Sequence, residues 1–236
     1  AATISPADID GWKQEIESAS VFMTQLEQPL EAAMRALEIA RNAGVTTLLN
    51  TAPAAPLPDG MLALCDYVTP NEPEAEGLTG IPVKSLDDAR KAADRLLGQG
   101  AGAAILTLGE NGALYHDADR SVHVPAFGAG PVRETTGAGD AFNGAFAAAL
   151  TRGMAPVDAV RFGCAAAAIS VTRPGAAASM PDLGEVEARA RALKARVARL
   201  EVEESGSWEE GFNCPQDVAD TAPSICDNEE RLLAAR

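Results

Sequence analysis

The sequence predicts an α/β fold with a mostly parallel sheet and helices on both faces. Strand-like and helix-like segments alternate along the chain, as they do in folds built from parallel strands joined by helices. The 236 residues are enough for one such domain with a sizeable core. Hydrophobic residues make up 47% of the chain and aromatic residues only 4%, so this core consists mainly of Ala, Leu and Val.

The first elements are read from caps and apolar spacing. Pro6–Ser18 is predicted to be helical, with Ser5 as its cap, and Ser20–Leu26 is predicted to be a strand. Pro29–Asn42 has an amphipathic helical pattern that Gly44 closes. The next elements are a β-rich run, a helical turn and a short strand, at Val45–Leu49, near Met61 and at Tyr67–Val68.

The later elements complete the alternation. Leu86–Leu97 is predicted to be a helix and Ala103–Leu108 a buried strand. Tyr115 and Val122–Val124 predict a hairpin whose turn is Asp117–Asp119. Three further helices are predicted, at Asp140–Thr151, Pro156–Thr172 and Glu185–Leu200.

The composition changes after Leu200. Residues 201–236 contain ten acidic residues and two arginines, so this segment carries −8 of the net charge of −15. It is rich in Gly, Ser, Pro and Asn and has little periodicity. We therefore expect one domain over residues 1–200 and an acidic, disordered tail over residues 201–236.

The charge and the apolar pattern exclude several classes of function. A net charge of −15 disfavours nucleic acid or an anionic membrane as a partner. No apolar run approaches 18 residues, and no basic stretch followed by an apolar run opens the chain. The expected location is therefore cytoplasmic. Cys65 and Cys164 lie in apolar surroundings and are expected to be buried, reduced thiols.

The most informative segment is the glycine-rich run that ends in Asp140. Gly137, Ala138 and Gly139 stand where a loop turns into a helix, so their backbone N–H groups can hold an anion. Asp140 lies beside this anion hole and could take a proton from an attacking hydroxyl. The pattern indicates phosphoryl transfer to an alcohol. The alternative is an ordinary turn with Asp140 as a helix cap.

Three acidic or amide residues elsewhere allow two interpretations each. Asn71 and Glu74 are three residues apart at a helix start, where they could hold a magnesium–phosphate group through water or simply cap the helix. Glu27 follows an apolar run and stands at the end of a strand. Ligands bind at such ends in open α/β sheets, although a solvated loop carboxylate is an equal alternative.

Small residues mark two further loops. Thr107, Gly109 and Gly112 follow a predicted strand, where a phosphate or a ring could approach the backbone closely. An ordinary turn at the end of a strand is the alternative. Gly175 and Ser179 stand between two predicted helices, either as a plain connecting loop or as part of a cation site.

The run Glu134–Gly144 closely resembles the C-terminal signature of the ribokinase-like (PfkB) family of sugar and nucleoside kinases. The likeness covers residues 3–199 and is closest to the ribokinase branch of the family. Four further segments resemble family segments: Asn50–Ala54, Thr69–Glu76, Thr107–Gly112 and Val171–Ala176.

This resemblance implies ATP-dependent phosphorylation of a sugar primary hydroxyl, with D-ribose giving D-ribose 5-phosphate as the first candidate. Another sugar or a nucleoside is the alternative. Asp140 would be the base and contact the substrate, together with Glu27, and Gly137, Ala138 and Gly139 would form the anion hole. ATP would contact Asn71, Thr107, Gly109, Gly112 and Gly139. Glu74 would hold Mg²⁺ through water, and a K⁺ site would involve Glu134, Thr136, Ser170, Arg173, Gly175 and Ser179.

The chain departs from the family pattern in two ways. Glu134 occupies a position where the family most often has Asp, which changes the geometry available to a cation. Family members also carry a further N-terminal segment that supplies the first strands, most of the sugar surface and a β lid. We therefore expect a weak kinase, and a homodimer where the lid is present. The alternative is a truncated chain that acts only as an interaction module.

Overall fold

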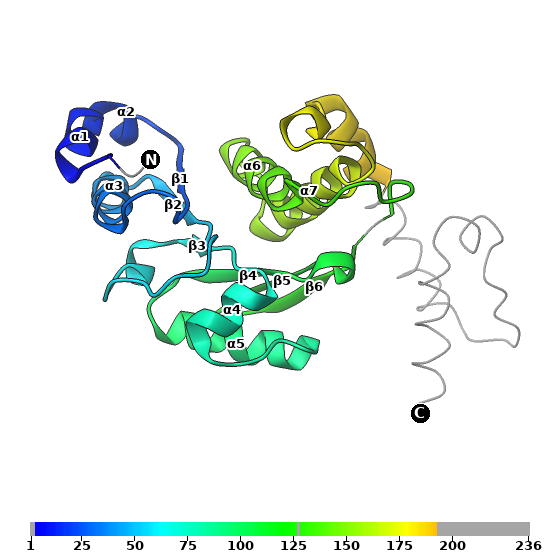
Figure 1. Cartoon of the computed structure of the whole chain (residues 1–236), viewed down its shortest axis with the longest axis horizontal. Coiled ribbons are helices and arrows are strands. Elements are labelled where there is room, and N and C mark those ends of the chain that lie inside the picture. The colour runs from blue at the N-terminus through cyan, green and yellow to red at the C-terminus, as the bar shows by residue number, and fades with distance from the viewer. Residues whose placement is uncertain (1–2, 127, 193–236) are drawn as a thin grey trace, which may run out of the picture.

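A six-stranded sheet forms the middle layer of the molecule (Figure 1). The structure is a computed structural model that describes residues 3–126 and 128–192. The strands lie side by side in chain order: β1 (Val21–Thr24), β2 (Thr46–Leu49), β3 (Tyr67–Val68), β4 (Ala103–Thr107), β5 (Ala113–Asp117) and β6 (Ser121–Val124). β1 to β4 are parallel, and β5 and β6 continue the sheet in antiparallel pairing. The mostly parallel sheet is therefore confirmed.

Helices cover both faces of this sheet. One face carries α3 (Leu30–Asn42), α4 (Glu72–Thr79) and α5 (Leu86–Gly98), and the other carries α6 (Ala138–Thr151) and α7 (Pro156–Ser170) (Figure 1). Neighbouring residues of β4 divide between the two faces. Leu106 packs under α5, whereas Ile105 packs under α6 and α7. This alternation of buried side chains is the period of two that a strand covered on both faces requires.

The first two helices pack on α3 rather than on the sheet. They are α1 (Pro6–Gly11) and α2 (Lys13–Glu17). Ser5 caps α1 in a reciprocal arrangement with Asp8, as its sequence position predicts. The prediction of one continuous helix over Pro6–Ser18 is wrong, because the chain bends at Trp12. Gly11 is a poor helix former, and its position next to the bend accounts for the break.

Other boundaries shift by a few residues. β1 is shorter than predicted, and α7 ends at Ser170. The start of α6 at Ala138, two residues before Asp140, matters more because it draws the glycine run into the first helical turn. Residues 183–192 are helical, whereas the rest of the predicted helix Glu185–Leu200 and the tail over residues 201–236 lie outside the described residues.

Short 3₁₀ turns connect several of these elements: η1 (Leu62–Leu64), η2 (Gly109–Asn111) and η3 (Ala177–Ser179). Within the described ranges, no helix has both the length and the apolar character needed to cross a bilayer. Cys65 and Cys164 are free and buried, and burial raises the pKa of both thiols to about 12. Both are therefore inert residues of the core, as their apolar surroundings predict.

β1 forms one edge of the sheet. It pairs with β2 on one side, and no other described strand lies on its outer side. Met23, in the middle of this strand, is 44% exposed. Phe22 points the other way and packs against the cores beneath α3.

The close contact between α6 and α7 depends on Gly163, which has no side chain. A Cβ at Gly163 would lie 2.8 Å from the Phe142 ring and 3.0 Å from its carbonyl oxygen, whereas a Cβ at Gly144 would meet nothing within 4 Å. We therefore predict opposite effects in urea unfolding. Gly163→Ala lowers the free energy of unfolding by about 1–3 kcal/mol because it overpacks the contact. Gly144→Ala raises it by about 0.5–1 kcal/mol through helix propensity. Equal effects of the two changes would contradict this packing.

Candidate functional site

The carboxyl ends of β1 to β4 meet at one edge of the sheet because the four strands are parallel. Backbone hydrogen bonds continue past the strands and join the loops that follow. The amide of Asn50 donates to the carbonyl of Thr24 at 2.9 Å, and that of Thr107 donates to Pro70 at 2.9 Å. Several residues singled out from the sequence follow these strands: Glu27, Asn71, Glu74, Thr107, Gly109 and Gly112. The topology thus gathers them at the edge where open α/β sheets bind ligands.

The first turn of α6 offers unpaired backbone donors. Gly137 precedes the helix in the left-handed region, with φ +79°. The amide of Ala138 is used by a turn bond to the Thr135 carbonyl at 3.1 Å. The amides of Gly137, Gly139 and Asp140 have no acceptor among the residues that the structure describes. Three donors and the positive end of the helix dipole thus share one turn, which suits an anion.

Asp140 stands in the same turn with an exposed side chain. Its carboxylate makes no hydrogen bond and no ion pair with any described residue. Both oxygens are therefore available to a ligand. A carboxylate beside unpaired amides can accept a proton from a hydroxyl that approaches the bound anion.

A buried hydrogen bond ties this turn to the sheet. The Thr69 hydroxyl, just after β3, donates to Oδ1 of Asn143 at 2.7 Å, and Nδ2 of Asn143 donates to the Gly139 carbonyl at 3.0 Å. Thr69 is 1% exposed and Asn143 is 4% exposed. Neither residue has a role that is predicted from the sequence. The available signal was a single amide side chain on an otherwise apolar helix of Ala and Phe.

Glu74 lies in the first turn of α4, and its side chain is buried. Asn71 caps this helix, and the two side chains bond each other's backbone amides. The Glu74 carboxylate also accepts hydrogen bonds from Nδ2 of Asn71 at 2.8 Å and from the Thr51 hydroxyl at 3.1 Å. The helix-capping interpretation therefore describes the geometry. One lone pair of Oε1 remains free to accept a further hydrogen bond, for example from a water molecule.

The loop after β4 lies beside Asn71. A parallel bridge pairs Asn71 with Thr107, and η2 follows. Gly112 has φ +90°, and a Cβ there would lie 2.1 Å from the Val124 carbonyl oxygen. Only glycine fits at this position. The structure thus brings Asn71 and Thr107 together and exposes Gly109 next to them.

Glu134 joins the segment before α6 to the loop after α7. The Gly175 amide donates to Oε2 of Glu134 at 2.7 Å. This hydrogen bond, followed by one from Thr136, holds the pKa of Glu134 below its usual range. Gly137 approaches Ala176 so closely that a Cβ would lie 3.3 Å from the Ala176 Cα. The two segments are therefore in contact at Glu134 and at Gly137, the first residue of the glycine run.

The other residues of the implied K⁺ site use their side chains locally. The hydroxyls of Ser170 and Ser179 each donate to a backbone carbonyl three residues earlier. Arg173 forms an ion pair with Glu185. Of the six residues in the implied set, Glu134 and Gly175 are the pair whose hydrogen bond joins the two segments.

Glu27 is exposed just past the end of β1 and accepts a hydrogen bond from Nε2 of Gln25 at 3.3 Å. It shares the sheet edge with the other candidates. No contact among the described residues joins it to Asp140.

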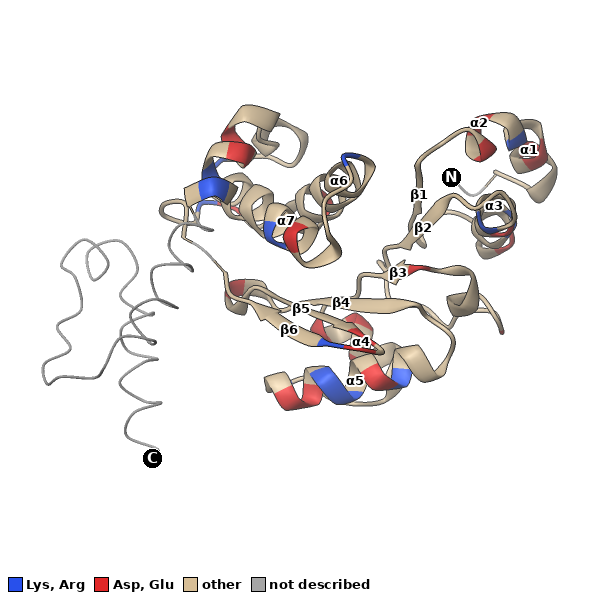
Figure 2. Cartoon of the chain, turned by 180° about the vertical axis from the view of Figure 1, so that it is seen from behind, with Lys and Arg blue, Asp and Glu red and all other residues tan. Residues whose placement is uncertain are grey.

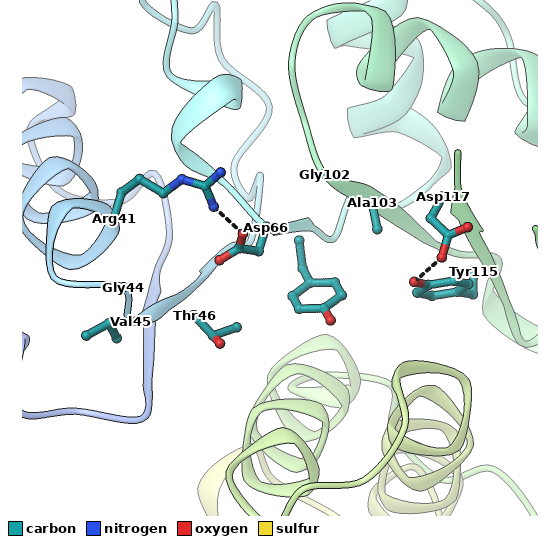
Figure 3. Close-up of a pocket in the computed structure, with 10 residues that line it drawn as sticks. Arg41, Gly44, Val45, Thr46, Asp66, Gly102, Ala103, Tyr115 and Asp117 are labelled. Carbon is teal, nitrogen blue, oxygen red and sulfur yellow. Dashed lines mark hydrogen bonds and ion pairs between the residues drawn. The ribbon is translucent and has the colours of Figure 1, made fainter. Parts of the chain in front are cut away.

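A cavity of about 560 Å³ lies at the opposite, amino edge of the strands (Figure 3). Its polar walls include the Arg41–Asp66 ion pair and the Tyr115 hydroxyl, which donates to Asp117 at 2.6 Å. None of the candidate site residues lines it. The cavity is therefore separate from the candidate site.

Fixed positive charge is sparse where the candidates gather: Arg173 is paired with Glu185, and Arg133 precedes the segment 134–140. Lysines and arginines are present on helices such as α5, where they alternate with acids (Figure 2). The edge segments contain neither residue type: 25–29, 50–56, 69–71, 108–112 and 134–140. Any anion bound there would depend on backbone amides and on cations from solution.

Comparison with known proteins shows which family the chain resembles. The model of the pfkB family of carbohydrate kinases matches residues 13–183, which is more than half of the chain. The chain is 40% identical over 185 residues to the ribokinase of Staphylococcus aureus, a match that covers 78% of this chain and 60% of the relative. It is also 40% identical over 181 residues to the deoxyribokinase of Salmonella typhi, covering 76% and 59%.

The fold has the same relatives. A solved structure of Arabidopsis thaliana ribokinase in complex with ribose and ATP matches with a TM-score of 0.74 at 28% identity, covering 80% of this chain and 60% of that chain. The ribokinase-like fold is therefore confirmed. The chain spans about 60% of the length of these relatives.

The buried Glu74 carboxylate provides a test of this edge. We predict that Glu74→Gln lowers the free energy of unfolding by about 1–3 kcal/mol, because the new amide group turns a donor towards the donors of Asn71 and Thr51. The matched control is Glu76→Gln on the exposed side of the same helix, which should change stability by less than about 0.5 kcal/mol. Equal urea midpoints for the two variants would show that the capping contacts add nothing.

Proposed function

Because the chain belongs to the pfkB family of carbohydrate kinases, we propose that it carries the phosphoryl-transfer part of a sugar kinase site. The proposed reaction moves the γ-phosphoryl group of ATP to a primary hydroxyl of a sugar. The observation that carries the proposal is the first turn of α6, where Asp140 stands beside three amides without acceptors.

In the proposed reaction, Asp140 accepts the proton of the sugar hydroxyl as its oxygen attacks the γ-phosphorus. A new oxygen–phosphorus bond forms, and the bond to the ADP oxygen breaks. The amides of Gly137, Gly139 and Asp140 stabilise the negative charge on the transferring group. Of the three residues in the implied anion hole, Ala138 contributes less, because its amide already donates to Thr135.

D-Ribose is the proposed substrate. The ribokinase of Staphylococcus aureus and the deoxyribokinase of Salmonella typhi are both 40% identical to the chain, so 2-deoxy-D-ribose is the second candidate. Glu27 is the described carboxylate proposed to contact the sugar, because it shares the sheet edge with Asp140. The proposed nucleotide contacts lie at the same edge and in α6: Asn71, Thr107, Gly109, Gly112 and Gly139.

The residues present fit Mg²⁺. The Glu74 carboxylate has one free lone pair and would hold the ion through a water molecule, because Mg²⁺ usually keeps several of its waters. When bound with ATP, the ion neutralises charge on the phosphates. Asn71 keeps the Glu74 carboxylate in place for that water.

A turnover assay with nucleotide calorimetry tests this proposal. We expect the 236-residue chain to bind ATP but to phosphorylate ribose slowly or not at all. Fusing the N-terminal segment of the Staphylococcus aureus ribokinase in front of the chain should give ribose-dependent ADP formation. Asp140→Asn in the fusion should lower turnover by about 10²–10⁴-fold and leave ATP affinity unchanged.

Asp158→Asn is the matched control, because Asp158 lies in the first turn of the neighbouring helix α7 as Asp140 does in α6. It should leave turnover intact. Retention of more than half of the turnover in Asp140→Asn would exclude a base role. Failure of both preparations to bind ATP would reject the kinase assignment.

We further propose a weak monovalent-cation effect, because Glu134 already reaches Gly175 directly. The prediction is that KCl raises ATP affinity slightly at constant ionic strength. Glu134→Asp, which shortens the side chain and breaks this direct bond, should increase the dependence on KCl. Calorimetry in KCl against choline chloride measures both. A flat response in the native chain and in the variant would remove the cation from the site.

A further inference from the structure

A chain of hydrogen bonds runs from the sheet edge into the first turn of α6. Nδ2 of Asn50, after β2, donates to the Thr69 carbonyl at 3.0 Å and to its hydroxyl at 3.3 Å. The Thr69 hydroxyl donates to Asn143 at 2.7 Å, and Asn143 donates to the Gly139 carbonyl at 3.0 Å. We call this set of Asn50, Thr69, Asn143 and Gly139 the polar brace.

The two central residues of the polar brace, Thr69 and Asn143, are buried, and the bonds of the brace are directional. Asn143 is the polar residue among the buried positions of α6, where its companions are Ala141, Phe142, Phe146 and Ala149. Apolar packing also resists movement of the helix, but it is not directional, so it fixes the rotation of the helix less specifically than a hydrogen bond does. A buried hydroxyl and amide lose their hydrogen bonds if the helix turns or slides, which costs free energy at each step.

The position of the brace connects two parts of the site. Thr69 stands two residues before Asn71, and Pro70 between them accepts the Thr107 amide. Gly139, at the other end, belongs to the turn that carries the unpaired amides and Asp140. The brace therefore sets the distance between the loops after β3 and β4 and the first turn of α6.

We propose that Thr69 and Asn143 are positioning residues that hold the amides of Gly139 and Asp140 in place for the terminal phosphate of a nucleotide. The functional part of this inference rests on the proposed kinase site. Amides displaced by about 1 Å lose much of their effect on a transferring group. Loss of the brace should therefore affect a triphosphate more than a diphosphate.

The test compares Thr69→Val, which keeps the shape and removes the hydroxyl, with Thr69→Ser, which keeps the hydroxyl. Thr47→Val is the matched control, because Thr47 is also a fully buried threonine of this sheet. Its hydroxyl bonds the Leu64 carbonyl and Asp66 near the start of β3, away from α6. Asn143→Ala removes the brace from the helix side and is the second variant if Thr69→Val does not fold.

Two measurements on the 236-residue chain are needed. Amide hydrogen exchange at Ala138 and Ala141 reports the order of the first turn without any nucleotide. Calorimetry with ATP and with ADP reports the contribution of the terminal phosphate. We expect faster exchange and about a tenfold loss of the preference for ATP over ADP in Thr69→Val and Asn143→Ala. Thr69→Ser and Thr47→Val should behave as the native chain does in both.

Equal weakening of ATP and ADP, or the same change in Thr47→Val, would reduce the brace to a general stabiliser and overturn the inference. Unchanged exchange at Ala138 and Ala141 in both brace variants would overturn it too. If the native chain binds neither nucleotide, the kinase proposal fails separately. Faster exchange in the brace variants alone would then still support positioning of the turn.

Discussion

Parallel pairing of β1 to β4 is the constraint on which the rest of the site depends. It sends four successive loops to one edge, where backbone bonds past the strand ends join them to one another. Asn71 can then cap α4 next to Thr107, and Glu74 can bury its carboxylate beneath that cap. α6 is the element that does not follow from the strand order. It is attached to the same edge through Thr69 and Asn143. The candidate residues are thus held at or next to regular elements, which position them more rigidly than free loops would.

The electrostatics of the edge differ from those of the whole chain. A net charge of −15 would repel a polyphosphate at long range, and no lysine or arginine stands in the edge segments to offset it. In the proposed site, the amides of Gly137, Gly139 and Asp140 would act only within a hydrogen-bond length, so they would favour a phosphate that is already placed. Recognition of this kind selects by position more than by charge. It also explains why cations from solution would matter, since they lower the long-range repulsion that the amides cannot.

Local features of the site were predictable from the sequence, whereas contacts between distant segments were not. The run from Gly137 to Asp140 predicts a helix start with free backbone N–H donors. The alternation of strand-like and helix-like segments predicts the mostly parallel sheet. Thr69 and Asn143 lie 74 residues apart, and no local pattern pairs them. Glu134 and Gly175 lie 41 residues apart, and the family resemblance, not a local pattern, assigned them to one implied cation site. The direct hydrogen bond between them is visible only in the structure. The bend at Trp12 was not predicted for a different reason. The apolar spacing of a single helix continues through this position.

The outer edge of β1 has a consequence for the chain in solution. On the outer side of β1, the backbone N–H and C=O groups that do not pair with β2 point away from the sheet. Met23 adds apolar surface beside them. Such an edge is a template that can capture a strand from another copy. The net charge of −15 keeps copies apart at low ionic strength, but salt near 0.1 M screens this repulsion beyond about 10 Å. Above that salt concentration, pairing at this four-residue edge would depend on short-range contacts rather than on the net charge.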